Sequence, residues 1–442
     1  MPTIAVIDTD VTYHLISFDE KGRERTDDPD GLMSDVITRE LASSDVTDVF
    51  LISHGWRGDL PAANAQYQRW IRAMFDRAED RRRIREKRPD FRALLVGVHW
   101  PSEPFGEEDF QDVSFDTDTA PPVDVEAQVT KWAERLGTGV DGTAALHTIL
   151  TSAAEDPIPP ALPDDVREAY LSLNLALGLG TDGVGAAPDA DRESFDPDAA
   201  YLAALDEEVD FGGGFSFGDL LTPLKQLSFW TMKARARTVG ENGGHEFLRA
   251  LQHVPRPAGR EDVRFHMIGH SFGCIVVTAM VAGPPGGSGP VRPVSSMALV
   301  QGAVSLWSYC STIPDVGGPG YFHPLIERDD VSGPVLTTRS VHDKAVGFWY
   351  PKAAGLHGAP DFLAVLPRVG GLGAFGIQGP GPKLNDLDMG DENAVYDFRP
   401  GQVYNLMADG TIFGGDFFSG AHSQITGSAV AHSVWVGVIA AP

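Results

Sequence analysis

The stretch Gly269–Gly273 constrains the fold of this chain more than any other, because it has the form Gly-x-Ser-x-Gly between two apolar segments. Residues 263–268 before it have the composition of a β-strand, and residues 274–280 after it that of a buried helix. A strand, a sharp turn and a helix raise the hydroxyl of Ser271 above the edge of a sheet. A side chain in place of either glycine would crowd such a turn. The pattern therefore predicts a strand–turn–helix unit with Ser271 at its apex.

Strand and helix patterns alternate along most of the chain. Besides the Ser271 strand, strands are expected at residues 11–18, 49–52, 93–98, 297–300, 335–338 and 402–406, and helices around residues 32–41, 63–78, 165–177, 229–251 and 428–439. Such alternation is typical of a mostly parallel central sheet with helices on both faces. We therefore predict an α/β fold and a single domain over residues 1–442.

Residues 103–228 interrupt this alternation and differ from the rest of the chain in charge. Between Glu103 and Leu220 there are 27 acidic and four basic residues, a balance of −23 within a net charge of −27. This part is rich in Pro, Asp and Gly and contains a few helical patterns. We predict that residues 103–228 form a large acidic, partly helical insertion that acts as a lid or cap.

The composition also excludes several classes of protein. With 42 % hydrophobic residues the chain can bury a core, so it is not wholly disordered. A net charge of −27 disfavours nucleic acid as a partner. The two cysteines, Cys274 and Cys310, supply no disulfide framework or metal cluster. No apolar run reaches the ~18 residues of a membrane span, and the first residues lack the form of a signal peptide. We therefore expect a soluble, cytoplasmic protein.

Ser271 is a candidate nucleophile, and two later residues are candidates for its partners. A serine hydroxyl needs a histidine base, and that base usually needs an acid that selects its tautomer. Asp343 follows the expected strand two strands after that of Ser271, and His422 follows the last expected strand. Because the carboxyl ends of parallel strands meet at one edge of a sheet, we expect the three side chains to lie together.

These features make the chain resemble the α/β-hydrolase superfamily. The resemblance rests on the stretch Gly269–Gly273, on the chain order Ser, Asp, His, and on His54-Gly55-Trp56 after an early strand. It covers roughly residues 1–102 and 229–442 and leaves the acidic segment unmatched. In one respect the chain departs from the commonest pattern: its insertion follows the fourth strand, whereas caps more often follow the sixth.

The resemblance implies a function and a role for each residue. Ser271 is expected to be the nucleophile, His422 the general base and then acid, and Asp343 the carboxylate that orients His422. The backbone N–H groups of Trp56 and Phe272 are expected to form the oxyanion hole. The implied reaction is hydrolysis of a small-molecule carboxylic ester or related acyl compound through an acyl-enzyme, with no cofactor and no metal. We expect three side chains near the mouth of the pocket to contact substrate: Trp56, Trp100 and Phe272.

Other functions and other residues stay open. An amidase, peptidase, thioesterase or acyltransferase uses the same triad, and a non-catalytic binding protein would use the acidic insertion as its surface. His432 competes with His422, but its apolar helical surroundings favour packing. Several acids compete with Asp343, namely Asp329, Asp330, Asp386, Asp388 and Asp391. We expect His54 to shape the oxyanion loop rather than to act as a base.

Some motifs are assigned no chemistry. Residues Gly371–Gly376 have the form Gly-x-Gly-x-x-Gly, but Gly and Pro follow where a dinucleotide site needs a helix, so we predict a flexible loop. The pair His342-Asp343 lacks a third metal ligand at suitable spacing. The basic run over residues 81–88 is expected to be a solvated helix end, with phosphate binding or pairing to the acidic insertion as alternatives. His270 and Cys274 are expected to pack around the turn.

Overall fold

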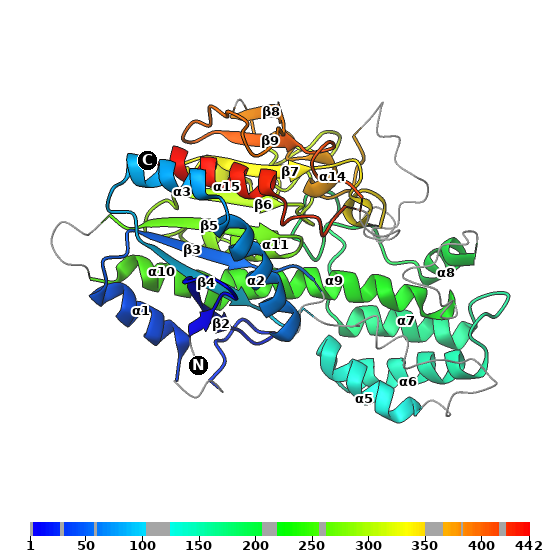
Figure 1. Cartoon of the computed structure of the whole chain (residues 1–442). Helices are drawn as coiled ribbons and strands as arrows, with labels where there is room; N and C mark the ends of the chain where they lie inside the picture. The colour runs from blue at the N-terminus through cyan, green and yellow to red at the C-terminus, as the bar shows by residue number, and fades with distance from the viewer. Residues whose placement is uncertain are drawn as a thin grey trace.

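One mixed sheet organises the molecule. The computed structural model describes residues 3–26, 31–56, 60–102, 124–205, 219–255, 262–349, 366–381, 383–414 and 421–442. Within these residues nine strands form one sheet in the order β1-β2-β4-β3-β5-β6-β7-β9-β8 (Figure 1). The pairing of β1 with β2 is antiparallel, and the other pairings are parallel. The predicted α/β class with a mostly parallel sheet is confirmed.

Seven of these strands coincide with the strands expected from the sequence. The nine are β1 (Thr3–Ala5), β2 (Thr12–Ser17), β3 (Asp48–Ser53), β4 (Ala93–His99), β5 (Arg264–His270), β6 (Ser296–Val300), β7 (Val335–Arg339), β8 (Leu384–Asp388) and β9 (Val403–Met407). The two unexpected strands, β1 and β8, lie at the two edges of the sheet. β8 has the sequence Leu-Asn-Asp-Leu-Asp, and Asn and Asp are poor strand formers, so its pattern gave no strand signal.

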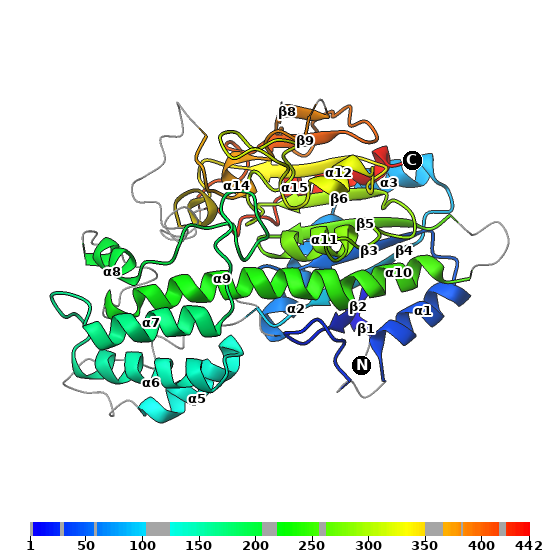
Figure 2. The ribbon, with the colours of Figure 1, turned by 180° about the vertical axis from the view of Figure 1, so that it is seen from behind.

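Helices cover both faces of the sheet, as Figures 1 and 2 show from opposite sides. One face is covered by α1 (Met33–Ser43), α9 (Thr222–Val239), α10 (His245–His253) and α11 (Gly273–Ala282). The other is covered by α2 (Leu60–Phe75), α3 (Ala78–Lys87) and α15 (Ser428–Ala440). Each face buries its own apolar core against the strands. Among the described helices, none is both long and apolar enough to cross a membrane.

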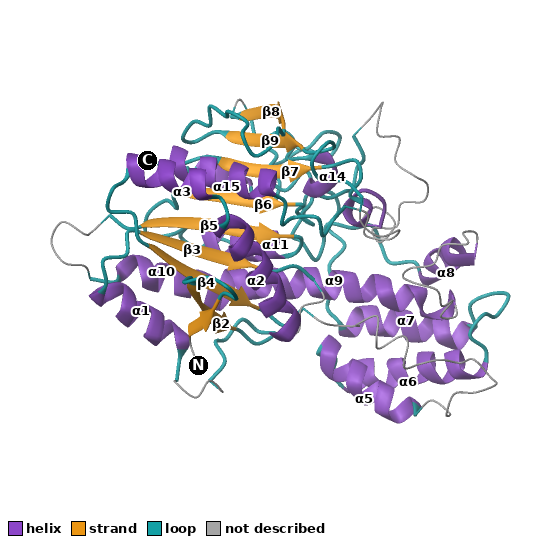
Figure 3. Cartoon of the chain, in the orientation of Figure 1, coloured by secondary structure: helices purple, strands orange, loops and turns teal. Residues whose placement is uncertain are grey.

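Four helices from the acidic segment form a helical group beside the sheet (Figure 3). They are α5 (Val125–Leu136), α6 (Val140–Glu155), α7 (Asp164–Ala176) and α8 (Pro197–Leu205). Their apolar sides make a third core that contains Trp132, Leu146 and Tyr170. Leu224 and Leu227 of α9 also belong to this core, whereas Val239 of the same helix packs against the sheet. The boundary expected at residue 228 therefore falls inside a continuous helix that joins the two parts.

The segment between α7 and α8 holds the helical group against the sheet body. Arg237 of α9 contacts the carboxylate of Asp189 with two hydrogen bonds of 2.8 and 2.9 Å. The backbone N–H of Tyr321 donates to the carbonyl oxygen of Gly185 at 2.9 Å. These contacts tie a loop of the acidic segment to a core helix and to a loop that follows β6.

The basic run in α3 is paired locally. Arg82 and Arg83 contact Glu79 of the same helix at 2.7 and 3.1 Å, and Arg88 contacts the buried Asp48 at 2.6 Å. α3 packs against α15, at the end of the molecule opposite the helical group (Figure 1). The alternative that this run pairs with the acidic insertion is therefore wrong for the described residues.

Candidate active site

Ser271 stands at a strained turn between β5 and α11. Its φ angle is 55°, a left-handed conformation that costs a residue with a side chain about 1–2 kcal/mol. A Cβ atom at Gly269 would lie 2.7 Å from the backbone of Cys274, and one at Gly273 would lie 2.3 Å from the carbonyl oxygen of Ser53. The turn therefore requires both glycines, as the Gly-x-Ser-x-Gly pattern predicts.

The loop after β3 approaches this turn closely. A Cβ atom at Gly55 would lie 2.9 Å from the Cβ of Ser271, so only glycine fits there. The next residue, Trp56, packs its ring on Phe272 with centroids 5.6 Å apart. Phe272 occupies the N-cap position of α11, where backbone N–H groups have no acceptor within the helix and the helix dipole favours negative charge. The two residues expected to form the oxyanion hole are thus neighbours beside Ser271.

Asp343 and His422 form a buried pair. Nδ1 of His422 lies 2.8 Å from Oδ2 of Asp343, whose side chain is fully buried. The pair comes from the loop after β7 and the loop after β9, and the N–H of Ala421 ties these loops by donating to the carbonyl oxygen of His342 at 2.9 Å. With Nδ1–H donated to the carboxylate, Nε2 of His422 keeps its lone pair and can accept a proton.

The His422 loop also contacts the residue that precedes Ser271. Nε2 of His270 lies 3.0 Å from the carbonyl oxygen of His422, and the two rings have centroids 5.1 Å apart. Within the described residues the hydroxyl of Ser271 makes no hydrogen bond to His422. Hydrogen bonds between nucleophile and base often tighten only when substrate binds. The structure thus brings Ser271, His422 and Asp343 to one edge of the sheet.

Gln301 is a site residue that the sequence analysis missed. Its Nε2–H donates to Oδ2 of Asp343 at 2.8 Å, while the backbone N–H of Val346 donates to Oδ1 at 3.2 Å. Gln301 has a φ of 46° and is held by Thr338, whose hydroxyl accepts from its N–H and donates to its Oε1. Its signal in the sequence was its place directly after a buried strand, the same signal that identified Asp343.

Residues Gly371–Gly376 do not form the flexible loop that we predicted. They contain a buried helical turn, α14 (Leu372–Phe375), and the carbonyl oxygen of Gly373 accepts from the N–H of Ser340 at 2.7 Å. A Cβ atom at Gly373 would lie 2.7 Å from Oδ2 of Asp343. The glycine is needed because the helix packs directly on this carboxylate, a contact between distant segments that local sequence patterns do not reveal.

His54 orders the loop that carries Gly55 and Trp56. Its Nδ1–H donates to the carbonyl oxygen of Gly55 at 2.8 Å, and its Nε2 accepts from Nδ1–H of His99 at 3.0 Å. Burial lowers the pKa of His54 to about 3 and that of His99 to about 4, so both rings are neutral at pH 7. Trp100 is fully buried and stacks on His54. This packing does not favour the contact with substrate that we predicted for Trp100, and that contact stays a prediction.

The competing residues lie apart from the Asp343–His422 pair. His432 lies in α15, where its Nδ1 is 2.9 Å from the buried carboxylate of Asp80 on α3. The competing acids for which contacts are described have other partners: Lys383 for Asp329, Arg328 for Asp330, Asn405 for Asp386 and the N–H of Asn393 for Asp391. Asp388 ends β8 and is exposed.

Aromatic side chains connect the Ser271 turn to α9. The ring of Phe229 lies 5.1 Å from that of Phe272 and 5.8 Å from that of Trp56, centroid to centroid. Phe229 and Phe272 are buried, whereas Trp56 is partly exposed. The helix that begins in the helical group therefore touches the residues beside Ser271.

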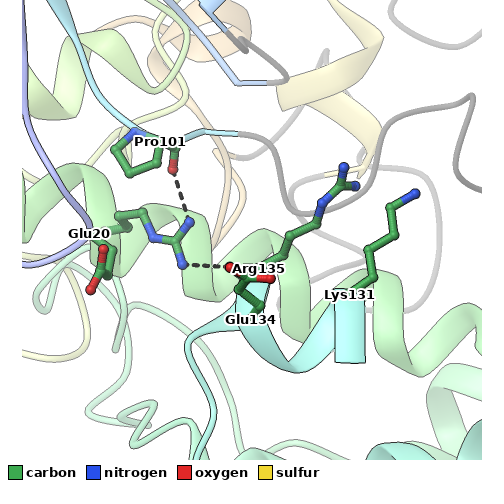
Figure 4. A pocket seen from close by; sticks show the side chains of 6 residues that line it. Glu20, Pro101, Lys131, Glu134 and Arg135 are labelled. Carbon is green, nitrogen blue, oxygen red and sulfur yellow. Dashed lines mark hydrogen bonds between the residues drawn. The ribbon is translucent and has the colours of Figure 1, made fainter. Parts of the chain in front are cut away.

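A cavity of about 470 Å³ lies where α5 meets the sheet body (Figure 4). Arg235 of α9 lines it and donates to the carbonyl oxygens of Pro101 at 3.0 Å and Arg135 at 2.7 Å. Burial lowers the pKa of Arg235 to about 10, so it stays charged at pH 7. None of the predicted site residues lines the cavity, whose walls are Glu20, Pro101, Lys131, Glu134, Arg135 and Arg235. Arg235 thus ties the end of α5 to the residues that follow β4.

Neither metal-ligand clusters in the described part of the chain nor similar proteins identify the chemistry of the site. Over the residues that the structure describes, no group of three or more His, Cys, Asp or Glu side chains is arranged to hold a metal ion. Comparisons with family models, curated proteins and solved structures find no match to this chain. The function of the site has to be inferred from its own geometry.

Proposed function

We propose that this protein is a serine hydrolase that cleaves a carboxylic ester through an acyl-enzyme. One observation is the main support for the proposal. A serine in a left-handed turn at the end of β5 lies at the same sheet edge as a buried Asp343–His422 pair with a 2.8 Å hydrogen bond. A left-handed conformation at a residue with a side chain is costly, and residues held in such conformations cluster at active sites.

The topology supports the same proposal. Ser271 follows β5, Asp343 follows β7 and His422 follows β9, and these strands run parallel. The loop of His54-Gly55-Trp56 follows β3. This arrangement agrees with the α/β-hydrolase fold that the sequence resembles, in which the nucleophile, the acid and the base occur in this chain order.

The proposed reaction starts with attack of the Ser271 oxygen on the ester carbonyl. Nε2 of His422 takes the hydroxyl proton, and Asp343 stabilises the imidazolium through Nδ1–H. The tetrahedral intermediate collapses, the carbon–oxygen bond to the alcohol breaks, and His422 gives its proton to the leaving alcohol. Water, deprotonated by His422, then attacks the acyl carbon. The bond to the Ser271 oxygen breaks, His422 returns the proton to that oxygen, and the acid is released.

The negative oxygen of the intermediate needs donors that are already in place. In this proposal the backbone N–H groups of Phe272 and Trp56 are these donors. The start of α11 adds a favourable dipole at the same position. Loss of one such donor typically costs about 3–4 kcal/mol of barrier lowering.

We assign the helical group the role of a lid or cap over the pocket. Support comes from α9, which starts in the core of this group and places Phe229 against Phe272 and Trp56. The segment 103–228 is strongly acidic, so its field disfavours anionic substrates. A neutral ester avoids repulsion by the acidic segment, and an apolar part of that ester can pack beside these aromatic rings.

A fluorophosphonate probe tests the proposal. It reacts with an activated serine, so we expect the wild type to be labelled at Ser271 and the Ser271→Ala variant to remain unlabelled. Cys310→Ser serves as a control for non-specific modification of the chain. An unlabelled but folded wild-type protein would contradict the proposal.

Substrate series then separate esters from the other acyl compounds. We expect p-nitrophenyl esters to be hydrolysed and matched p-nitroanilides to be much poorer substrates. Acyl chains of increasing length measure how much apolar surface the pocket accepts. Faster cleavage of the anilides would assign the site to amide hydrolysis instead.

A further inference from the structure

The side chain of His270 connects the Ser271 turn to the His422 loop and to α2. Its Nε2 lies 3.0 Å from the carbonyl oxygen of His422. Its Nδ1 lies 3.0 Å from Nε2 of Gln66, and the edge of its ring packs on Trp70 at a centroid distance of 6.3 Å. The ring is buried, and both of its nitrogens have protein partners.

The protonation of His270 follows from these partners. A carbonyl oxygen only accepts hydrogen bonds, so Nε2 of His270 must bear the hydrogen. Burial lowers the pKa of His270 to about 3, so the ring is neutral at pH 7 and Nδ1 has no hydrogen. The amide of Gln66 therefore donates to Nδ1. Gln66 thus selects the tautomer of His270 that donates to the backbone of His422.

We propose that His270 is a positioning residue for His422, with Gln66 as the group that selects its tautomer. This inference rests on the proposed function and adds a residue to it. The bond to the carbonyl oxygen holds the backbone of His422, while Asp343 holds its ring at 2.8 Å. Nucleophile and base are thereby tied to the same strand end, because His270 directly precedes Ser271.

Two substitutions separate positioning from simple packing. In His270→Gln the side-chain amide N–H reaches about the place of Nε2–H and restores the donor, whereas His270→Leu keeps the bulk and removes the donor. Gln66→Leu leaves His270 in place but removes the group that selects its tautomer. His253→Leu is the matched control, because His253 also contacts a backbone carbonyl oxygen but is exposed on α10.

The rate of fluorophosphonate labelling and the unfolding midpoint are measured for each variant. We expect His270→Leu to slow labelling about 10- to 100-fold, since small displacements of a catalytic group have effects of this size. We expect His270→Gln to stay within about threefold of the wild type and Gln66→Leu to fall between the two. Equal losses in His270→Leu and His270→Gln, or a wild-type rate in His270→Leu, would overturn the inference.

A measurement on the resting protein keeps the two proposals distinguishable. The proton between Nδ1 of His422 and Asp343 is followed by NMR, and its exchange with water is compared between variants. We expect exchange about tenfold faster in His270→Leu and unchanged in His270→Gln. If the wild type is not labelled, the proposed hydrolase activity fails, while the exchange rates still decide whether His270 positions His422. Unchanged exchange in His270→Leu would count against positioning.

Discussion

Two sets of Ser, His and Asp among the described residues lie at opposite edges of the sheet, one at the amino ends and one at the carboxyl ends of the parallel strands. At the amino edge, Ser296 Oγ lies 2.8 Å from Nδ1 of His266, and Nε2 of His266 lies 3.0 Å from Asp48. At the carboxyl edge, Nδ1 of His422 lies 2.8 Å from Asp343, beside the turn of Ser271. Both sets include a residue of β5 or one directly after it, and we propose a chemical role only for the second.

The two sets differ in the ring nitrogen that contacts the aspartate, Nε2 in His266 and Nδ1 in His422, and in the backbone conformation of the serine. Ser296 is the first residue of β6 and is paired in the sheet, whereas Ser271 is in a left-handed turn before a helix. Asp48 is also bound by Arg88 at 2.6 Å. Burial alone raises the pKa of Asp48, but the contacts with His266 and Arg88 outweigh it and lower the pKa. The amino-edge set is a buried hydrogen-bond network joined to the Asp48–Arg88 ion pair, and the comparison shows that residue types alone do not define a site.

Removal of each serine hydroxyl gives the sharpest contrast between the edges. We expect Ser271→Ala to lower kcat for a p-nitrophenyl ester about a millionfold, as for loss of a nucleophile in other serine hydrolases. We expect Ser296→Ala to leave kcat within about threefold, because Ser296 is buried at the opposite edge. Steady-state kinetics on both variants check this. An equal loss of kcat in the two would erase the distinction.

Replacement of each aspartate separates catalysis from stability. We expect Asp343→Asn to lower kcat about 10⁴-fold while the protein stays folded, because the amide favours the wrong tautomer of His422. We expect Asp48→Asn to lower the free energy of unfolding by about 3–5 kcal/mol, because it leaves the buried Arg88 without its counter-charge. Steady-state kinetics and urea unfolding on both variants test whether Asp343 serves catalysis and Asp48 serves stability. A stable Asp48→Asn variant with low kcat would contradict this separation.

Acid should lower the free energy of unfolding first through buried histidines, which lie at both edges, since burial also lowers the pKa of His266 at the amino edge. Burial lowers the pKa values of His54 and His270 to about 3 and of His99 to about 4, from 6.5. Below pH 6.5 the unfolded chain therefore binds protons that the folded chain does not, and each ring costs up to about 1.4 kcal/mol of stability per pH unit. The lowered pKa of Asp48 acts in a later window, since its contribution to stability is lost only as the pH falls below about 4.

Urea unfolding between pH 7.5 and 5 measures this dependence. The slope of interest is the change in the free energy of unfolding with pH. We expect His99→Asn to reduce this slope by up to about 1.4 kcal/mol per pH unit, because Asn keeps a donor for His54 but does not titrate. The exposed His147, changed to Gln, is the control and should leave the slope unchanged. A stability that does not change over this range would show that these rings are accessible to protons.

Local patterns predicted much of the fold and the strand ends that carry the candidate site residues. The strands that precede Ser271, Asp343 and His422 contain short apolar stretches, and their parallel pairing places the following residues at one edge. The Gly-x-Ser-x-Gly pattern predicted the turn because the steric need for its glycines is local. The helices α7 and α15 were likewise predicted from their periodicity.

Contacts between distant segments could not be predicted in this way. Gln301 and Gly373 contact Asp343 only because β6 and α14 fold against the loop after β7. The continuity of α9 across residue 228 depends on two separate cores, one on each half of the helix. His270 was expected only to pack, since its partners Gln66 and His422 lie far away in the chain.

The smallest expected difference concerns the backbone at the two serines. Ser271→Gly should raise the free energy of unfolding by up to about 1 kcal/mol, because glycine adopts a φ of 55° without the cost that a side chain incurs. Ser296→Ala should lower it by about 1 kcal/mol, because Nδ1 of His266 loses its donor. Urea unfolding of both variants at pH 7.5 gives the two signs directly. Opposite signs would mean that the carboxyl-edge serine is held in a conformation that costs stability, whereas the amino-edge serine stabilises the fold. A loss of stability in Ser271→Gly would mean that contacts of the Ser271 side chain outweigh the strain of its backbone.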